Sequence, residues 1–214
     1  MKKEISVHKL VYISLTLTVC MIAGRIIYTG NLYGTYLIWN LFLAWLPFMF
    51  SLLLLKREQK LFVRYALFTV WLLFFPNAPY IITDLFHLRH RSPVPYWYDL
   101  LMLFWASWNG LLLGILSLMN VERYLNIHFR SRTVNTVVNV CLVLCAFGVY
   151  AGRYLRWNSW YVVSDPKSIA KDLASIAFNP WDNLRTWGVT FFFSLLMITI
   201  YKTMKGLKQY GSNL

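Results

Sequence analysis

The chain has 214 residues, of which 58% are hydrophobic and only 14% charged, against about 25% charged residues in an ordinary soluble domain. This composition excludes a soluble globular protein and predicts an integral membrane protein. The formal net charge of +13 does not indicate nucleic-acid binding, because no basic run is long enough or suitably interleaved with aromatic residues. The apolar segments recur too evenly to leave room for a soluble module, so residues 1–214 should form a single integral membrane domain.

Six apolar segments follow a short basic leader at residues 1–9, and a helix needs about 20 residues to cross a bilayer. The first apolar segment is too long for a signal peptide and lacks a cleavage site of small residues, so we expect it to remain in the mature protein as a helix. The predicted helices cover residues 10–28, 33–55, 61–75, 96–120, 134–154 and 185–204. The sequence therefore predicts an all-α fold, a multi-pass transmembrane bundle of about six helices.

Residues 74–90 interrupt this pattern with two prolines, an asparagine, a carboxylate and two histidines. The third helix is short for a full crossing, so residues after Pro76 should fold partly into the membrane. Membrane proteins place such residues at bilayer depth only where protein or a water-filled cavity surrounds them. Broken helices of this kind expose backbone groups to ligands. We interpret this Pro-broken segment as the functional site.

The longest connection, residues 155–184, contains Ile169, Leu173, Ile176 and Ala177 at helical spacing. This spacing predicts a short amphipathic helix over 168–178, at the membrane interface before the sixth span. The three cysteines, Cys20, Cys141 and Cys145, lie in apolar segments and are interpreted as buried small residues rather than as a disulfide or a metal pair.

Lysine and arginine concentrate on the side of the bundle that holds both termini. Cytoplasmic loops carry this excess, so both termini are predicted to be cytoplasmic. The unusual polar residues then converge on the outer side.

The predicted catalytic residues are Asp84, His87 and Asp99. Asp84 and His87 are three residues apart, so on a helical turn they share a face and could perform acid–base chemistry. With His90 one turn further they could instead ligate a metal ion, or the group could be a structural polar cluster. Asp99 could equally complement the dipole of the helix that it begins. These patterns specify no cofactor and no oligomeric state, and they leave metal binding open.

Arg153 and Arg156 are also three residues apart, at the end of the fifth helix. Planar guanidinium groups bind phosphate or carboxylate in a bidentate manner, although arginines here could also snorkel or favour the helix dipole. Asn40 and Asn109 lie near the middle of their helices, where interhelical hydrogen bonding is the stronger interpretation. The predicted substrate-binding residues are Asn77, Tyr80, Asn109, Arg153, Arg156 and Asn158.

Three strings carry a family resemblance: FPNAPYIITDL at 75–85, WYD at 97–99 with WNG at 108–110, and GRYLRWNSW at 152–160. They resemble the bacterial membrane protein family listed as domain of unknown function 1361, over about residues 40–201. The resemblance implies a multi-pass protein of the bacterial inner membrane with no established activity.

Three functional hypotheses remain. The first is a membrane enzyme whose outer site acts on a lipid or a lipid-linked anionic substrate, with membrane lipids as its partners. The second is a small-molecule carrier, which is weaker because no carboxylate or histidine lies in mid-helix and no two-fold repeat is found. The third is a scaffold subunit of a membrane complex.

Overall fold

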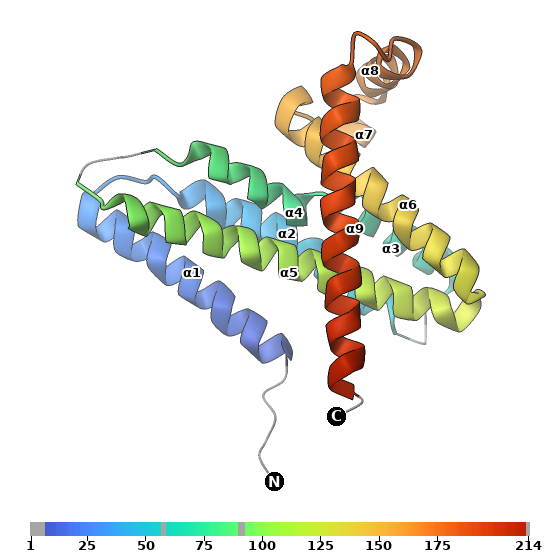
Figure 1. Ribbon diagram of the computed structural model, residues 1–214, viewed down its shortest axis with the longest axis horizontal. Coiled ribbons are helices and arrows are strands. Elements are labelled where there is room, and N and C mark those ends of the chain that lie inside the picture. The colour runs from blue at the N-terminus through green and yellow to red at the C-terminus, as the bar shows by residue number, and fades with distance from the viewer. Residues whose placement is uncertain (1–6, 57–58, 90–92, 213–214) are drawn as a thin grey trace. The chain divides into compact units, whose positions relative to one another are not determined.

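The computed structural model describes residues 7–56, 59–89 and 93–212, and every regular element in these ranges is a helix (Figure 1). Most of the basic leader at 1–9 lies outside them. The helices are α1 (Val7–Thr29), α2 (Thr35–Leu54), α3 (Leu61–Phe74), α4 (Asn77–Tyr80), the 3₁₀ helix η1 (Ile81–His87), α5 (Tyr96–His128), α6 (Ser131–Tyr150), the π-helix η2 (Ala151–Leu155), α7 (Tyr161–Ser164), α8 (Pro166–Phe178) and α9 (Leu184–Ser212).

Six stretches are long and apolar enough to cross a membrane, which confirms the predicted all-α, six-span fold class. They are Lys9–Thr29, Thr35–Leu54, Leu61–His87, Tyr96–His128, Ser131–Leu155 and Leu184–Tyr210. The chain divides into two compact units, Met1–Val121 and Glu122–Leu214, called unit 1 and unit 2 below. The single integral membrane domain over 1–214 stays a prediction.

Unit 1 is organised around the first part of α5, beside which α1, α2 and α4 lie (Figure 1). Its core is apolar and draws on each of these helices. The buried members include Ile22 of α1, Leu37 and Phe48 of α2, Ile81 of η1, and Met102 and Leu113 of α5. In a membrane such contacts stabilise helix association by close van der Waals packing, because lipid chains are as apolar as these side chains.

The predicted interruption after the third helix is confirmed as a bend. Pro76 and Pro79 lack a backbone N–H and disturb the helical ladder. The freed carbonyl groups find other donors: Asn77 Nδ2 donates to the Phe74 carbonyl oxygen at 3.0 Å, and the Ala78 N–H donates to that of Phe75 at 3.2 Å. The chain therefore continues through α4 and η1 to the end of the span.

The bent segment packs against two glycines of α5. A Cβ atom at Gly110 would lie 2.4 Å from the Ala78 carbonyl oxygen, and one at Gly114 would lie 3.1 Å from the Ala78 Cβ. Ser107 Oγ, one turn earlier, donates to the Ile81 carbonyl oxygen at 3.0 Å. Small residues four apart let helix backbones approach closely in membranes. This contact fixes the position of η1 and its polar side chains.

Unit 2 is built on the packing of α6 against α9. Cys141 and Cys145 are free and buried on α6, as predicted. The same prediction is wrong for Cys20, which is exposed because it lies on the outward side of α1. At the end of α5, the buried carboxylate of Glu122 accepts hydrogen bonds from Tyr201 Oη at 2.7 Å and Lys205 Nζ at 2.5 Å of α9.

The predicted amphipathic helix before the last span is confirmed as α8. Asp165 caps it, because its Oδ1 accepts a hydrogen bond from the Ser168 N–H at 3.3 Å, and Pro166 occupies the first turn. One side of α8 packs against the rest of unit 2, since Ile176 is buried and Asp172 accepts a hydrogen bond from Trp157 Nε1 at 3.2 Å.

Candidate functional site

A polar group gathers at the end of unit 1 where α1 and η1 end and α2 and α5 begin (Figure 1). Asp84 of η1 is only 2% exposed, and Asn40 Nδ2 of α2 donates to its Oδ2 at 2.7 Å. A buried carboxylate needs such a partner, because an unsolvated charge is costly. The predicted interhelical hydrogen bonding of Asn40 is thereby confirmed, with Asp84 as its acceptor.

His87 occupies the last turn of η1 and is exposed. Its ring meets the Tyr36 ring edge-on at a centroid distance of 5.9 Å, and its carbonyl oxygen accepts a hydrogen bond from Tyr33 Oη at 3.3 Å. Because a 3₁₀ helix has three residues per turn, Asp84 and His87 lie above one another on one side of η1. An accessible imidazole thus stands one turn from a buried carboxylate.

Asp99, at the start of α5, pairs with Arg25 of α1. Arg25 Nε donates to Asp99 Oδ1 at 2.7 Å and Arg25 Nη2 donates to Oδ2 at 3.2 Å, a bidentate arrangement in which both residues are buried. The Tyr33 ring lies 4.3 Å from the guanidinium carbon of Arg25. Asp99 therefore joins two helices, and its catalytic role stays a prediction.

Tyr33 connects the Arg25–Asp99 pair with η1, because its ring contacts Arg25 and its hydroxyl group donates a hydrogen bond to the His87 carbonyl oxygen. The structure thus brings the three predicted catalytic residues to the same end of unit 1. Among the described residues, no three His, Cys, Asp or Glu side chains gather in a way that could hold a metal ion. His90, the third ligand of the metal hypothesis, lies outside the described residues.

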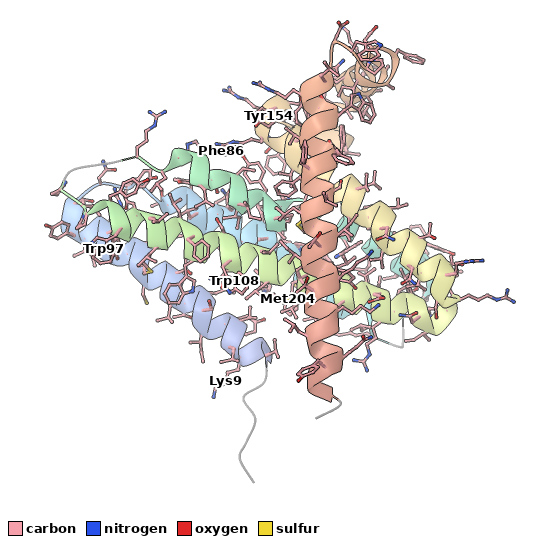
Figure 2. All side chains as sticks on the ribbon, viewed as in Figure 1. Lys9, Phe86, Trp97, Trp108, Tyr154 and Met204 are labelled. Atoms are coloured by element: carbon pink, nitrogen blue, oxygen red, sulfur yellow. The ribbon has the colours of Figure 1, made fainter. Side chains whose placement is uncertain are left out.

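Exposed aromatic side chains border this end of unit 1. Figure 2 shows Phe86 on η1 and Trp97 on α5, and both are exposed. Aromatic rings of this kind are enriched where helices leave the hydrocarbon core.

The other predicted binding residues of unit 1 have structural partners. Asn77 bridges the bend to Phe74, as described above, and Tyr80 is half-buried beside it. Asn109 accepts a hydrogen bond from Ser14 Oγ at 2.6 Å and donates to Thr18 Oγ1 at 2.8 Å. The interhelical hydrogen bonding predicted for Asn109 is confirmed. Substrate binding by these three residues stays a prediction.

In unit 2 the α-helical geometry of α6 ends at Tyr150 and continues as the π-helix η2. Arg153 lies within η2 and is half-buried, while Arg156 follows it, is exposed and has a left-handed backbone with φ 57°. The two arginines, predicted in the last turn of the fifth helix, therefore lie in a π-helical turn and at the residue that ends it. Asn158 is half-buried, and its carbonyl oxygen accepts a hydrogen bond from the Tyr161 N–H at 2.9 Å. Single π turns and left-handed residues are common at functional sites.

A third guanidinium group lies at this turn. Arg185, at the start of α9, has its guanidinium carbon 5.3 Å from the centre of the Tyr154 ring, whose position on η2 Figure 2 shows. Sequence reasoning missed this residue, although an arginine at the first turn of a span is a recognisable pattern. It also left Arg25, Tyr33 and Tyr36 outside the site. Arg25 could have been found, since a charge within an apolar helix must pair.

A family model described as "Protein of unknown function (DUF1361)" matches residues 39–200. The chain belongs to this family. The matched part contains Asn40, all three predicted catalytic residues and the π turn, whereas Arg25, Tyr33 and Tyr36 precede it. No curated protein and no solved structure matches the chain.

The DUF1361 chain thus carries two polar groups. Arg25, Asp84, His87 and Asp99 belong to unit 1, and the arginines of the π turn belong to unit 2. The contacts within each group are described above. That the two groups meet in one cluster stays a prediction.

Proposed function

We propose that this protein is an enzyme of the bacterial cytoplasmic membrane that acts, on its outer side, on a lipid or a lipid-linked anionic substrate. Both termini are cytoplasmic in this proposal, as the distribution of lysine and arginine favours. The observation that carries the proposal is the 3₁₀ turn η1, which holds an exposed imidazole one turn from a buried, hydrogen-bonded carboxylate.

In this proposal His87 exchanges a proton with the substrate, because imidazole changes charge near neutral pH. The carboxyl group of the buried Asp84 lies one 3₁₀ turn from His87 on the same helix. Asp99 with Arg25 holds α1 against α5 and keeps Tyr33 beside the backbone of His87.

The anionic group of the substrate would be bound in unit 2, by Arg153, Arg156 and Arg185. The supporting observations are the π turn, the left-handed backbone of Arg156 and the position of Arg185 beside Tyr154. Planar guanidinium groups bind phosphate and carboxylate oxygens in pairs, which a lysine cannot do.

The test compares membrane lipid extracts by mass spectrometry from deletion cells that carry either the parent chain or a variant. We expect His87→Ala and Arg153→Ala to accumulate the same lipid-linked species as the deletion, and Arg156→Lys to do so in part. His128→Ala is the matched control, because His128 is also exposed and also contacts a tyrosine ring edge-on, that of Tyr124.

Unfolding in detergent separates catalysis from structure. A catalytic role leaves the free energy of unfolding of the His87 and Arg153 variants close to that of the parent. A structural role would instead lower this free energy in the same variants. Unchanged lipid extracts together with normal unfolding in all three variants would refute the enzyme proposal and favour a scaffold subunit.

A further inference from the structure

The turn between α8 and α9 displays two large aromatic side chains. Phe178 is 84% exposed and Trp181 is 82% exposed. Each side chain has a large apolar area, and soluble proteins rarely leave neighbouring rings of this size in water. We therefore expect an apolar partner to cover these two side chains.

Hydrogen bonds fix the shape of this turn. Asn183 Nδ2 donates to the carbonyl oxygens of Asn179 at 2.9 Å and Ser175 at 3.4 Å, so the start of α9 closes the end of α8. The Asn183 N–H also donates to the Pro180 carbonyl oxygen at 3.2 Å. The two aromatic side chains are thus held outward by an ordered turn.

Helix α8 does not supply the apolar partner. Ile176 is buried against the rest of unit 2 and Asp172 accepts a hydrogen bond from Trp157 Nε1, while Leu173 is exposed. Lys171 and Phe178 are seven residues apart, so they lie on the same, outward side of the helix. Lys171 is exposed there. This side of α8 therefore carries an exposed lysine and ends in an aromatic ring.

The turn continues directly into the apolar surface of a membrane span. Helix α9 begins at Leu184, and Leu184, Trp187 and Phe191 are all exposed along its first turns. Tryptophan is enriched where a span enters the headgroup region, and lysine chains reach from that level into water. Along the chain, an exposed lysine is followed by two aromatic rings and then by an apolar span. Polarity falls in the same order from the aqueous side of a leaflet to its hydrocarbon core.

We propose that Phe178 and Trp181 form a membrane anchor that inserts into the leaflet through which α9 enters the bilayer. The partner is the lipid surface itself, and the rings occupy the boundary between headgroups and acyl chains. The anchor holds the π turn near the headgroups, because α8 is bound to Trp157 just after that turn. This anchor is independent of the proposed catalytic activity.

Nitroxide labels on single cysteines of the full chain in phosphatidylcholine vesicles test the anchor. The background is Cys20→Ala, which removes the exposed native thiol. Phe178→Cys and Trp181→Cys report on the turn, and Lys171→Cys on the outward side of α8 is the matched control. We expect labels at 178 and 181 to be more accessible to oxygen than to a water-soluble nickel chelate, and the label at 171 to show the reverse.

Greater access of the nickel chelate at 178 and 181 would place the turn in water and overturn the proposal. Low access of both reagents would also overturn it, because it indicates burial against protein. A second measurement keeps an aromatic ring in place: fluorescence quenching by brominated phosphatidylcholine should be smaller in Trp181→Phe than in the parent chain. Equal quenching in the two proteins would count against insertion even if the cysteine variants fail to fold.

Discussion

Removing one partner of the Arg25–Asp99 pair should strongly destabilise unit 1. Both side chains are almost fully buried, with 3% and 2% exposure, and two hydrogen bonds join them. The variant Asp99→Ala leaves the guanidinium group buried without its counter-charge. Such a change costs about 3–5 kcal/mol. In a chain of this size each kcal/mol lowers the melting temperature by about 2–4 °C, so the expected decrease is about 6–20 °C.

The double variant Arg25→Met with Asp99→Leu should recover most of this loss. Apolar residues of similar size often replace a buried ion pair with little effect on stability. Here they also remove Arg25 Nη1, a buried donor for which the described residues provide no hydrogen-bond acceptor. The assay is titration with sodium dodecyl sulfate in detergent micelles, and Asp182→Asn, at an exposed carboxylate, is the control.

Two results would refute this reasoning. Equal loss in Asp99→Ala and in the double variant would show that packing, rather than the unpaired charge, determines the effect. A stable Asp99→Ala variant that accumulates the substrate would assign Asp99 to catalysis alone.

Three further predictions concern packing and topology. Gly110→Ala should destabilise by about 1–3 kcal/mol, because its Cβ would lie 2.4 Å from a carbonyl oxygen, whereas Gly188→Ala, with open space, should be neutral or stabilising in the same unfolding assay. Asn109→Ala should cost about 1–3 kcal/mol, because the half-buried Ser14 hydroxyl group loses its acceptor and the buried Thr18 hydroxyl group loses a donor. Reporter fusions after Lys60 should indicate a cytoplasmic position and fusions after Lys171 an external one; an external result at Lys60 would contradict the orientation.

The six spans could be predicted from the sequence because a helix that crosses a bilayer needs an apolar segment as long as the hydrocarbon core is thick. The same measure places some helix ends wrongly. Helix α5 was expected to end at Asn120 but continues to His128, and α9 continues beyond Met204 to Ser212. Polar residues sustain backbone hydrogen bonds equally well, so apolarity marks where the membrane ends and not where the helix ends.

The polar site was predictable in part for a related reason. Proline, carboxylate and histidine within an apolar run identified η1, because each is costly at bilayer depth. Their partners were not predictable: Asp99 lies 74 residues from Arg25 and Asp84 lies 44 from Asn40, and no local pattern encodes such pairings. The π turn was also missed, since helical spacing alone predicts a continuous α-helix through Tyr154.

The hydrogen bonds of α1 have a consequence for the order in which the chain assembles during synthesis. The Ser14 hydroxyl group donates to Asn109 and the Arg25 guanidinium group to Asp99, both on α5 and 95 and 74 residues later. At about 5–20 residues per second, the ribosome needs on the order of 5–20 s to make that interval. During this time the arginine of the first span enters the bilayer without its carboxylate. Docking of α1 must therefore follow insertion of the fourth span, and a nascent chain that stalls before Asp99 should be the form most exposed to membrane proteases.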